Sequence, residues 1–267
     1  MKVVANGLGQ FYRRFGSGPP LVLIHALGLD HRLWDAQVAL LAPHHTVITY
    51  DVRGHGQTDA PNGPYAISDF GDDLQGLLEA LGIESAHLAG ISMGGMIAQE
   101  FTLTRPSRVR SLVLADTTSE YHQDARRQFA ERARVVEERG IAPLLGPTME
   151  RWFTPEFRDR RPDDVERIRG ILAASHPAGY AASCRAIAGL DLTEVLVNIS
   201  VPVLVLVGSE DTSTTPEMAL RIHEHIPGSR YEVIARAAHL TNIAEPEAFA
   251  RAVIETVLRG ERSETSE

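Results

Sequence analysis

Short apolar runs alternate along this chain with longer stretches in which apolar residues recur every three or four positions. The runs are rich in branched aliphatic residues, end at glycine, proline or polar residues, and cover residues 20–26, 45–51, 86–90, 111–116, 201–208 and 231–235. Continuous apolar runs of this length are typical of strands buried on both faces of a parallel sheet. Residues 3–15 have a hairpin pattern instead, so we expect an antiparallel edge at the start of the sheet.

The clearest helical pattern is SDFGDDLQGLLEALG, at residues 68–82. Its apolar side chains follow the period of an α-helix and are Phe70, Leu74, Leu77, Leu78 and Leu81. Ser68 is the expected N-cap of this helix, because a serine hydroxyl can accept a free N–H of the first turn. Strand and helix alternate in this way along much of the chain, which predicts an α/β fold with a mostly parallel, twisted sheet flanked by helices.

The alternation stops between residues 118 and 197, where no convincing strand occurs. Charged helical stretches fill this segment, among them QDARRQFAERARVVEERG and PDDVERIRGILAAS. The segment is too long for one crossover between two strands, so we expect an inserted helical cap at residues 118–197, called the cap below. Residues 1–117 and 198–260 would form the core, and the polar residues 261–267 would be a frayed tail.

Composition narrows the expected function. The chain has 267 residues, 43% of them hydrophobic, which suffices for one large α/β domain. Its formal net charge is −9 and no basic run stands out, so we expect a small-molecule partner and no nucleic acid. No apolar run is long enough to span a bilayer, and the first residues lack the apolar segment of a signal peptide, which favours a cytoplasmic protein without a membrane partner.

The lone cysteine and the oligomeric state add little to this picture. Cys184 has no second cysteine to pair with, and we expect it to be a small buried apolar residue. A reducing compartment is compatible with this. The sequence leaves a homo-oligomer open.

Residues 90–94, GISMG, stand where a predicted strand turns directly into a predicted helix. Such a corner forces its central residue, Ser92, into a strained backbone conformation, and glycines on either side remove side chains that would collide. The Ser92 hydroxyl would project above the carboxyl ends of the strands, beside the free N–H of Met93. An ordinary turn is the alternative for this short motif alone, but its position between strand and helix favours a nucleophile.

A serine nucleophile needs a base to remove its proton, and a carboxylate to orient that base. Asp211 follows one later predicted strand and His239 follows the next, so both would lie with Ser92 at the carboxyl edge of the sheet. Glu210 and Asp116 are the alternatives for the carboxylate. The chain has neither the ligand spacing of a metal site nor a dinucleotide fingerprint, so we expect no metal and no cofactor.

The order Ser92, Asp211, His239 is that of the α/β-hydrolase fold enzymes, which the chain resembles along nearly its whole length. HALG, at residues 25–28, resembles the family's HGxG oxyanion loop, with Ala26 where glycine is usual. By that match Leu27 supplies the second oxyanion N–H beside Met93. Among such enzymes, the stretches HALGLDHRLWDAQV, YDVRGHGQTDAPNGPY, GISMGGMIAQEF and RWFTPEF look most like 3-oxoadipate enol-lactonases.

This resemblance implies a serine hydrolase that opens a small enol-lactone through a triad and an acyl-enzyme, in the catabolism of aromatic compounds. An anionic lactone would need a cation near the pocket, and the candidates are Arg151, beside Trp152 in the cap, and Arg32, near the oxyanion loop. Cap packing for Trp152 and a solvated helix face for Arg151 are the alternative interpretations.

Other functions keep part of this pattern. An esterase, a lactamase or a C–C bond hydrolase of the same fold would have the same triad and a different cap. A non-catalytic receptor for a small ligand on this scaffold would be expected to have a lost or slowed triad, and the intact set Ser92, Asp211 and His239 argues against it.

Overall fold

An eight-stranded sheet forms the centre of the computed structural model, which describes residues 1–264. Its strands are β1 (Lys2–Ala5), β2 (Leu8–Phe15), β3 (Pro20–Ile24), β4 (Thr46–Tyr50), β5 (Ala86–Ile91), β6 (Val109–Ala115), β7 (Val203–Gly208) and β8 (Arg230–Ile234). They lie in the order β1-β2-β4-β3-β5-β6-β7-β8. β2 pairs antiparallel with both β1 and β4, and every other pairing is parallel. The expected parallel sheet with an antiparallel edge is confirmed.

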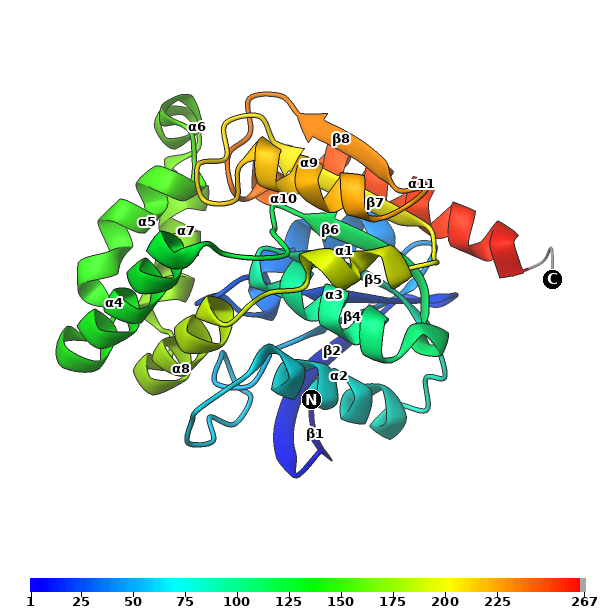
Figure 1. Ribbon diagram of the computed structural model, residues 1–267, viewed down its shortest axis with the longest axis horizontal. Helices are drawn as coiled ribbons and strands as arrows, with labels where there is room; N and C mark the ends of the chain where they lie inside the picture. Colours follow the sequence, from blue (N-terminus) through cyan, green and yellow to red (C-terminus); the bar gives the residue numbers. More distant parts are fainter. Residues whose placement is uncertain (265–267) are drawn as a thin grey trace.

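Helices cover both faces of the sheet (Figure 1). The α-helices are α1 (Asp35–Leu41), α2 (Ile67–Ala80), α3 (Met93–Thr104), α4 (Gln123–Arg139), α5 (Leu145–Trp152), α6 (Pro155–Arg160), α7 (Pro162–Ala173), α8 (Pro177–Ala188), α9 (Pro216–His225), α10 (Thr241–Ala244) and α11 (Pro246–Glu264). The 3-10 helices are η1 (His31–Trp34), η2 (Pro106–Arg108), η3 (Ala142–Leu144) and η4 (Thr193–Asn198). Because helices cover both faces, every residue of β4, β5 and β7 is buried, which explains their continuous apolar runs.

The start of α2 differs from the prediction. Ser68 lies inside the first turn rather than at the N-cap, which is Ala66. The Ala66 N–H donates to the Asp69 carboxylate at 2.8 Å, so an acidic side chain that reaches back from the first turn replaces the expected serine cap. The helix begins earlier because Ile67 belongs to its buried face.

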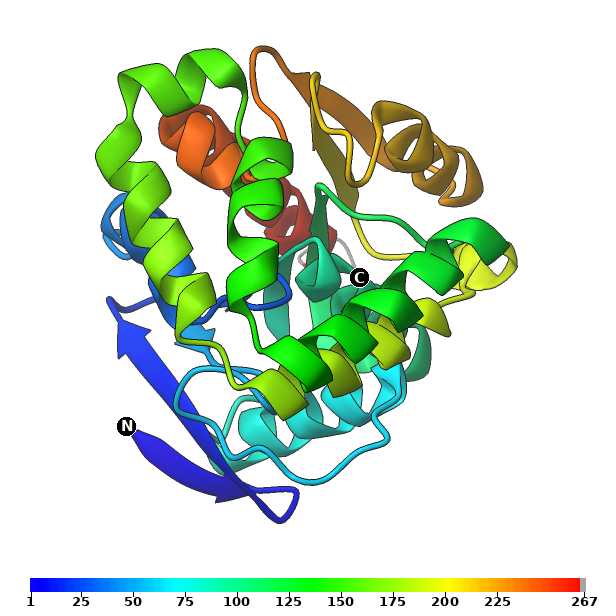
Figure 2. The same ribbon diagram turned by 90° about the vertical axis from the view of Figure 1, so that its left-hand side faces the viewer.

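The helices α4 to α8 gather on one side of the molecule, where they form a layer apart from the sheet (Figures 1 and 2). All of them lie between β6 and β7, within the range predicted for the cap. Within this layer α4 and α8 pack against each other. The chain enters and leaves the layer at one neck, where the Ser119 and Thr193 hydroxyls lie 2.6 Å apart and the Leu192 N–H donates to the Ser119 carbonyl.

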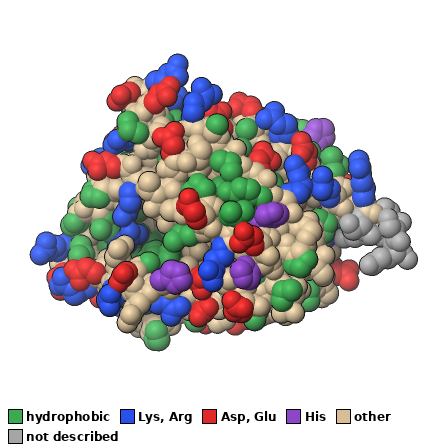
Figure 3. Space-filling model, turned by 45° about the horizontal axis from the view of Figure 1, so that its top comes forward, with side chains coloured by type: hydrophobic (Ala, Val, Ile, Leu, Met, Phe, Trp, Pro, Cys, Tyr) green, Lys and Arg blue, Asp and Glu red, His purple; other side chains and the backbone are tan. Residues whose placement is uncertain are grey.

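The C-terminal helix α11 extends away from the cap, on the opposite side of the molecule (Figure 1). It continues to Glu264, so residues 261–264 of the tail that we expected to fray are helical, because the helical hydrogen bonds continue into this polar stretch. The last residues of that predicted tail, 265–267, lie outside the described residues. Among the residues described, no helix has both the length and the apolar character needed to cross a membrane. Figure 3 shows a face on which basic and acidic side chains are interspersed.

Candidate active site

Ser92 occupies the sharp corner between β5 and α3. Its backbone φ is 55°, in the left-handed region that a non-glycine residue rarely adopts. Hydrogen bonds to the neighbouring strand's end hold this conformation: the Ser92 N–H donates to the Ala115 carbonyl at 2.9 Å, and the Thr117 hydroxyl donates to the Ser92 carbonyl at 2.7 Å. The strain predicted from the sequence is therefore present, and it belongs to Ser92 itself.

The two glycines that flank the corner have no room for a side chain. A Cβ on Gly90 would lie 2.2 Å from the Gly94 carbonyl oxygen, and one on Gly94 would lie 2.0 Å from the Ile24 carbonyl oxygen. Both obstacles are backbone atoms, which cannot turn aside as a flexible side chain can. Close backbone approach, rather than a positive φ, is the reason for glycine at these two positions.

The three predicted triad residues lie together. The His239 Nε2 is 2.9 Å from the Ser92 Oγ, and the His239 Nδ1 is 2.8 Å from the Asp211 Oδ2. Asp211 is itself held in its loop, because its Oδ1 accepts the N–H groups of Ser213 and Thr214 and its Oδ2 accepts the Thr214 hydroxyl. This continuous hydrogen-bonded chain can pass a proton from the serine to the histidine while the carboxylate fixes the ring.

Among the hydrogen bonds and ion pairs of the described residues, neither alternative carboxylate is a partner of His239. Glu210 is exposed at the surface of the same loop. Asp116 is fully buried, but its carboxylate accepts the backbone N–H of Gly208 and both the N–H and the hydroxyl of Thr241. Asp211 is therefore the carboxylate that is paired with His239.

The electrostatic surroundings of His239 favour its charged form. Burial alone would lower the pKa of this imidazole, but the charge of Asp211, the hydrogen bond to Asp211 and the charge of Asp116 together raise it above the ordinary value. Arg151 acts in the opposite direction. The balance suits a base that must hold a proton while an acyl intermediate forms.

Of the two expected oxyanion donors, Met93 directly follows Ser92 in the chain, and Leu27 lines the same cavity as Ser92. Met93 is the first residue of α3, so its N–H is one of the amides that a helix start leaves without an intrahelical partner. Leu27 lies in the loop that follows β3. A cap residue holds this loop in place, because the Ser175 hydroxyl donates to the Gly28 carbonyl at 2.6 Å.

A cavity of about 270 Å³ between the core and the cap opens onto Ser92 and His239. Arg151 and Trp152 line it, as expected, and the Trp152 ring centroid lies 6.2 Å from that of His239. Arg151 is half-buried, and its Nε has no hydrogen-bond partner among the residues that the structure describes. Burial, and secondarily the charge of Arg132, lower the pKa of the Arg151 guanidinium.

Sequence reasoning missed Arg132, a second arginine in this cavity. It lies on α4 and its guanidinium carbon is 5.1 Å from the centre of the Phe129 ring. Among the side chains that the structure describes, no acidic group forms an ion pair with either Arg132 or Arg151. Arg132 continues, at helical spacing, the row of cavity-lining residues Ala125, Gln128 and Phe129. A charged residue in such an inward-facing row was the sequence pattern that could have indicated Arg132.

Arg32 does not belong to this cavity, contrary to our expectation. Its guanidinium donates to both carboxylate oxygens of Asp30, at 2.6 Å for the shortest contact, and it lines a separate hollow with Asp30 and Gln57. The acidic neighbour two residues before it satisfies the charge. Nearness in sequence to the oxyanion loop therefore did not bring Arg32 to the substrate side.

One buried group of residues has the spacing of a metal site. Potential ligand atoms of Asp30, His31 and Asp51 lie within 4.8 Å of one another. Arg32 already pairs with Asp30, and the Asp51 carboxylate accepts the His31 backbone N–H and lies 2.8 Å from its Nδ1. Protein donors thus already occupy these carboxylates.

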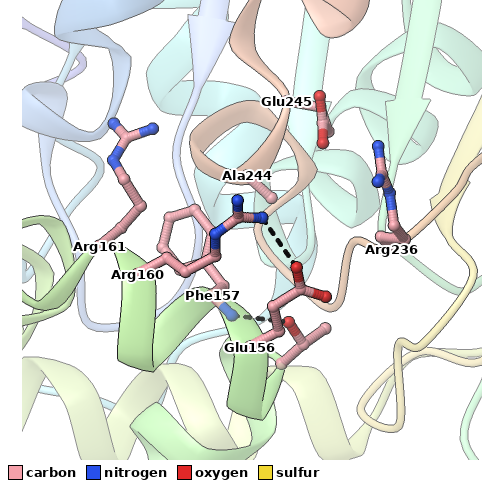
Figure 4. A pocket seen from close by; sticks show the side chains of 8 residues that line it. Glu156, Phe157, Arg160, Arg161, Arg236, Ala244 and Glu245 are labelled. Atoms are coloured by element: carbon pink, nitrogen blue, oxygen red, sulfur yellow. Dashed lines mark hydrogen bonds and ion pairs between the residues drawn. The ribbon is translucent and has the colours of Figure 1, made fainter.

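A second arginine-lined hollow lies outside the active cavity, between α6 and the loops around β8 and α10 (Figure 4). Here Arg160 pairs with Glu156 at 2.8 Å and Arg161 pairs with Asp164 at 2.6 Å. Both arginines are more than half exposed. These arginines differ from Arg132 and Arg151 in having carboxylate partners.

Comparison with known proteins agrees with this geometry. A model of the alpha/beta hydrolase fold family matches residues 19–246. The chain is 37% identical to 3-oxoadipate enol-lactonase 2 of Acinetobacter baylyi, over 94% of this chain and 94% of that protein. The enol-lactonase structure from Burkholderia xenovorans LB400 is similar with a TM-score of 0.92 and 32% identity, covering 97% of this chain and 100% of that one.

A malate-bound thermophilic esterase from Thermogutta terrifontis is also similar, with a TM-score of 0.93 and 29% identity, covering 97% of this chain and 98% of that one. Together with the parallel sheet and the corner serine, these matches identify the family. The chain belongs to the α/β-hydrolase fold family and is a hydrolase of that fold.

Proposed function

We propose that this protein is a serine hydrolase that opens a small enol-lactone bearing a carboxylate, with 3-oxoadipate enol-lactone as its substrate. The observation that carries the proposal is the hydrogen-bonded chain Asp211, His239, Ser92, which ends in a cavity containing two arginines without acidic partners. The names of two similar proteins, both enol-lactonases, support the substrate.

Acylation begins when the Ser92 oxygen attacks the lactone carbonyl carbon while His239 accepts the hydroxyl proton. The Leu27 and Met93 N–H groups stabilise the oxyanion of the tetrahedral intermediate. When this intermediate collapses, the ring C–O bond breaks. The leaving oxygen departs as an enolate that remains attached to the acyl chain on Ser92. The enolate takes up the proton held by His239, which returns the imidazole to its neutral form.

Deacylation uses the same groups. His239 removes a proton from water, which attacks the acyl carbonyl, and the proton then returns to the Ser92 oxygen as the ester bond breaks. The product is an open-chain acid. No metal or organic cofactor takes part in these steps.

Arg151 and Arg132 are proposed to bind the substrate carboxylate on the cap side of the cavity. An arginine binds a carboxylate with two parallel hydrogen bonds, and such charge-assisted bonds are strongest where water is limited. Both arginines line the cavity, and neither is already neutralised by a carboxylate among the described side chains. Trp152 would form the wall beside His239 against which the lactone ring packs.

The test is a spectrophotometric assay of the wild type and Ser92→Ala with 3-oxoadipate enol-lactone, a neutral γ-lactone and a short p-nitrophenyl ester. Ser68→Ala is the matched control, because Ser68 is an exposed serine far along the chain from the corner. We expect rapid loss of the enol-lactone by wild type and Ser68→Ala, slow ester turnover, and no turnover by Ser92→Ala.

Other outcomes would redirect the proposal. Ser92-dependent turnover of the ester or neutral lactone alone would keep the nucleophile and reject the substrate, in favour of an esterase or another hydrolase of this fold. Equal turnover by wild type and Ser92→Ala would reject the nucleophile. Binding of the lactone without turnover by the wild type would support a receptor.

A further inference from the structure

Asp116 is a buried carboxylate behind the triad to which the reaction above assigns no role. It follows β6 directly, is fully buried, and has a backbone φ of 45°. A non-glycine residue in this conformation is costly, and such strain persists only where the surrounding contacts enforce it. The Asp116 N–H donates to the Leu206 carbonyl at 2.8 Å, which ties this strained residue to the neighbouring strand β7.

The Asp116 carboxylate joins the two loops that carry the acid and the base. Its Oδ1 accepts the N–H of Gly208, the last residue of β7, at 2.9 Å, shortly before Asp211. Its Oδ2 accepts the Thr241 N–H at 3.1 Å and the Thr241 hydroxyl at 2.6 Å, at the start of α10 and shortly after His239. The Asp116 side chain thus restrains both the segment that precedes Asp211 and the segment that follows His239.

The charge of Asp116 acts on the same pair. All three of its side-chain partners are donors, an arrangement that favours the ionised carboxylate. Burial, and then the charge of Asp211, oppose ionisation and raise the pKa of Asp116, whereas the charge of His239 lowers it. An ionised Asp116 and a protonated His239 therefore stabilise each other.

We propose that Asp116 is a positioning residue that holds the Asp211 and His239 loops in register and places a second negative charge behind the His239 imidazole. This inference rests on the proposed roles of Ser92, Asp211 and His239. Asp211 remains the group that contacts the ring, and Asp116 acts through its bonds to Gly208 and Thr241.

Three charged groups determine the direction of the expected effect on His239. Asp211, on the loop after β7, and Asp116, after β6, raise the pKa of His239, whereas Arg151, on α5, lowers it. Removing the charge of Asp116 leaves Asp211 and Arg151 in place, so the pKa of His239 should fall. Because the base must be neutral in the free enzyme, the acid limb of the kcat/KM profile should then move to lower pH.

The experiment compares full-length wild type, Asp116→Asn and Thr241→Val, with p-nitrophenyl acetate as the assay substrate and NMR titration of the His239 ring nitrogens. Thr241→Val is the matched control, because it loses one tether to Asp116 and keeps the charge. For Asp116→Asn we expect kcat to fall about tenfold and the acid limb to move down by about 0.5 pH unit or more. For Thr241→Val we expect a smaller loss of kcat and an unchanged acid limb.

An unchanged His239 titration in Asp116→Asn would overturn the inference. The NMR readout does not depend on turnover, so this failure differs from failure of the proposed function, which would appear as turnover that does not need Ser92. Should Asp116→Asn not fold, a ¹³C-carboxyl titration of the wild type decides the question. An Asp116 that stays protonated throughout the active pH range would overturn the inference, and an ionised one would support it.

Discussion

The core and the cap hold their functional side chains in different ways. In the core, Ser92, Asp211 and His239 are held by a strained corner and by buried hydrogen bonds within short loops. In the cap, Arg132 and Arg151 extend from helices into the cavity, with an aromatic ring or one long contact to a threonine beside them. The core therefore holds Ser92, Asp211 and His239 rigidly, whereas the cap holds its two arginines by fewer contacts.

The ion pairs on the outer faces of the cap helices contribute little to the stability of the cap. These faces carry ion pairs one helical turn apart, such as Arg134 with Glu131 and Glu138, and Arg160 with Glu156, all of them largely exposed. Exposed pairs of this kind contribute little to stability. Helical amphipathicity can keep such a layer folded while its inward-facing residues change. This tolerance agrees with the proposed role of the cap in selecting the substrate.

Substitution of Asp211 should reduce activity most, whereas substitution of its exposed neighbour Glu210 should have almost no effect. Asp211→Asn should lower kcat by about 10³ to 10⁴, because an amide no longer holds the productive His239 tautomer or stabilises the imidazolium. Glu210→Gln, next to it but exposed, should retain wild-type kcat. Steady-state kinetics on both variants check this, and a large loss in Glu210→Gln would mean that the loop, rather than one carboxylate, matters.

Substitution of one glycine in the core, Gly94, and one in the cap, Gly146, tests whether the core is packed more tightly than the cap. Gly94→Ala should lower the free energy of unfolding by about 1–3 kcal/mol and abolish most activity, because its Cβ would lie 2.0 Å from a backbone oxygen. Gly146→Ala, in the cap helix α5, meets no atom within 4 Å and should raise stability by up to about 1 kcal/mol. Chemical denaturation measures both. Equal effects at the two positions would contradict this difference in packing.

The cap arginines should affect selectivity more than chemistry. Arg132→Gln and Arg151→Gln should each lower kcat/KM for the anionic enol-lactone about 10- to 100-fold, through loss of a charge-assisted bond. Turnover of a neutral p-nitrophenyl ester should change by no more than about twofold. Arg160→Gln, paired with Glu156 outside the cavity, is the control and should change neither. Parallel losses for both substrates would reject carboxylate recognition.

A smaller effect is expected at a hydrogen bond from the cap to the oxyanion loop. Ser175→Ala removes the hydroxyl that donates to Gly28, and it should lower kcat about two- to tenfold with little change in KM. Ser183→Ala removes a hydroxyl that bonds only within α8, to the Gly179 carbonyl, and should leave kcat unchanged. A change in KM alone for Ser175→Ala would assign the contact to substrate binding instead.

The sequence predicted the core far better than the cap for a physical reason. Buried strands, a strained serine corner and loops at the carboxyl edge each leave a local pattern. Short motifs therefore pointed to Ser92, Asp211 and His239, which the structure brings within hydrogen-bonding distance. Cap contacts depend on how helices distant in sequence pack, and the sequence around Arg132 resembles an ordinary charged helix. Arg32 was misplaced for a different, local reason, because its partner Asp30, two residues before it, was not weighed.

Covalent labelling can show directly whether Ser92 is the nucleophile. The wild type, His239→Ala and Ser92→Ala are treated with phenylmethanesulfonyl fluoride, and the adduct is mapped by peptide mass spectrometry while residual activity is followed. We predict one adduct, on Ser92, that forms in step with the loss of activity, forms far more slowly in His239→Ala, and is absent in Ser92→Ala. Full inactivation with the label on another residue, or labelling of Ser92 with activity intact, would contradict this prediction.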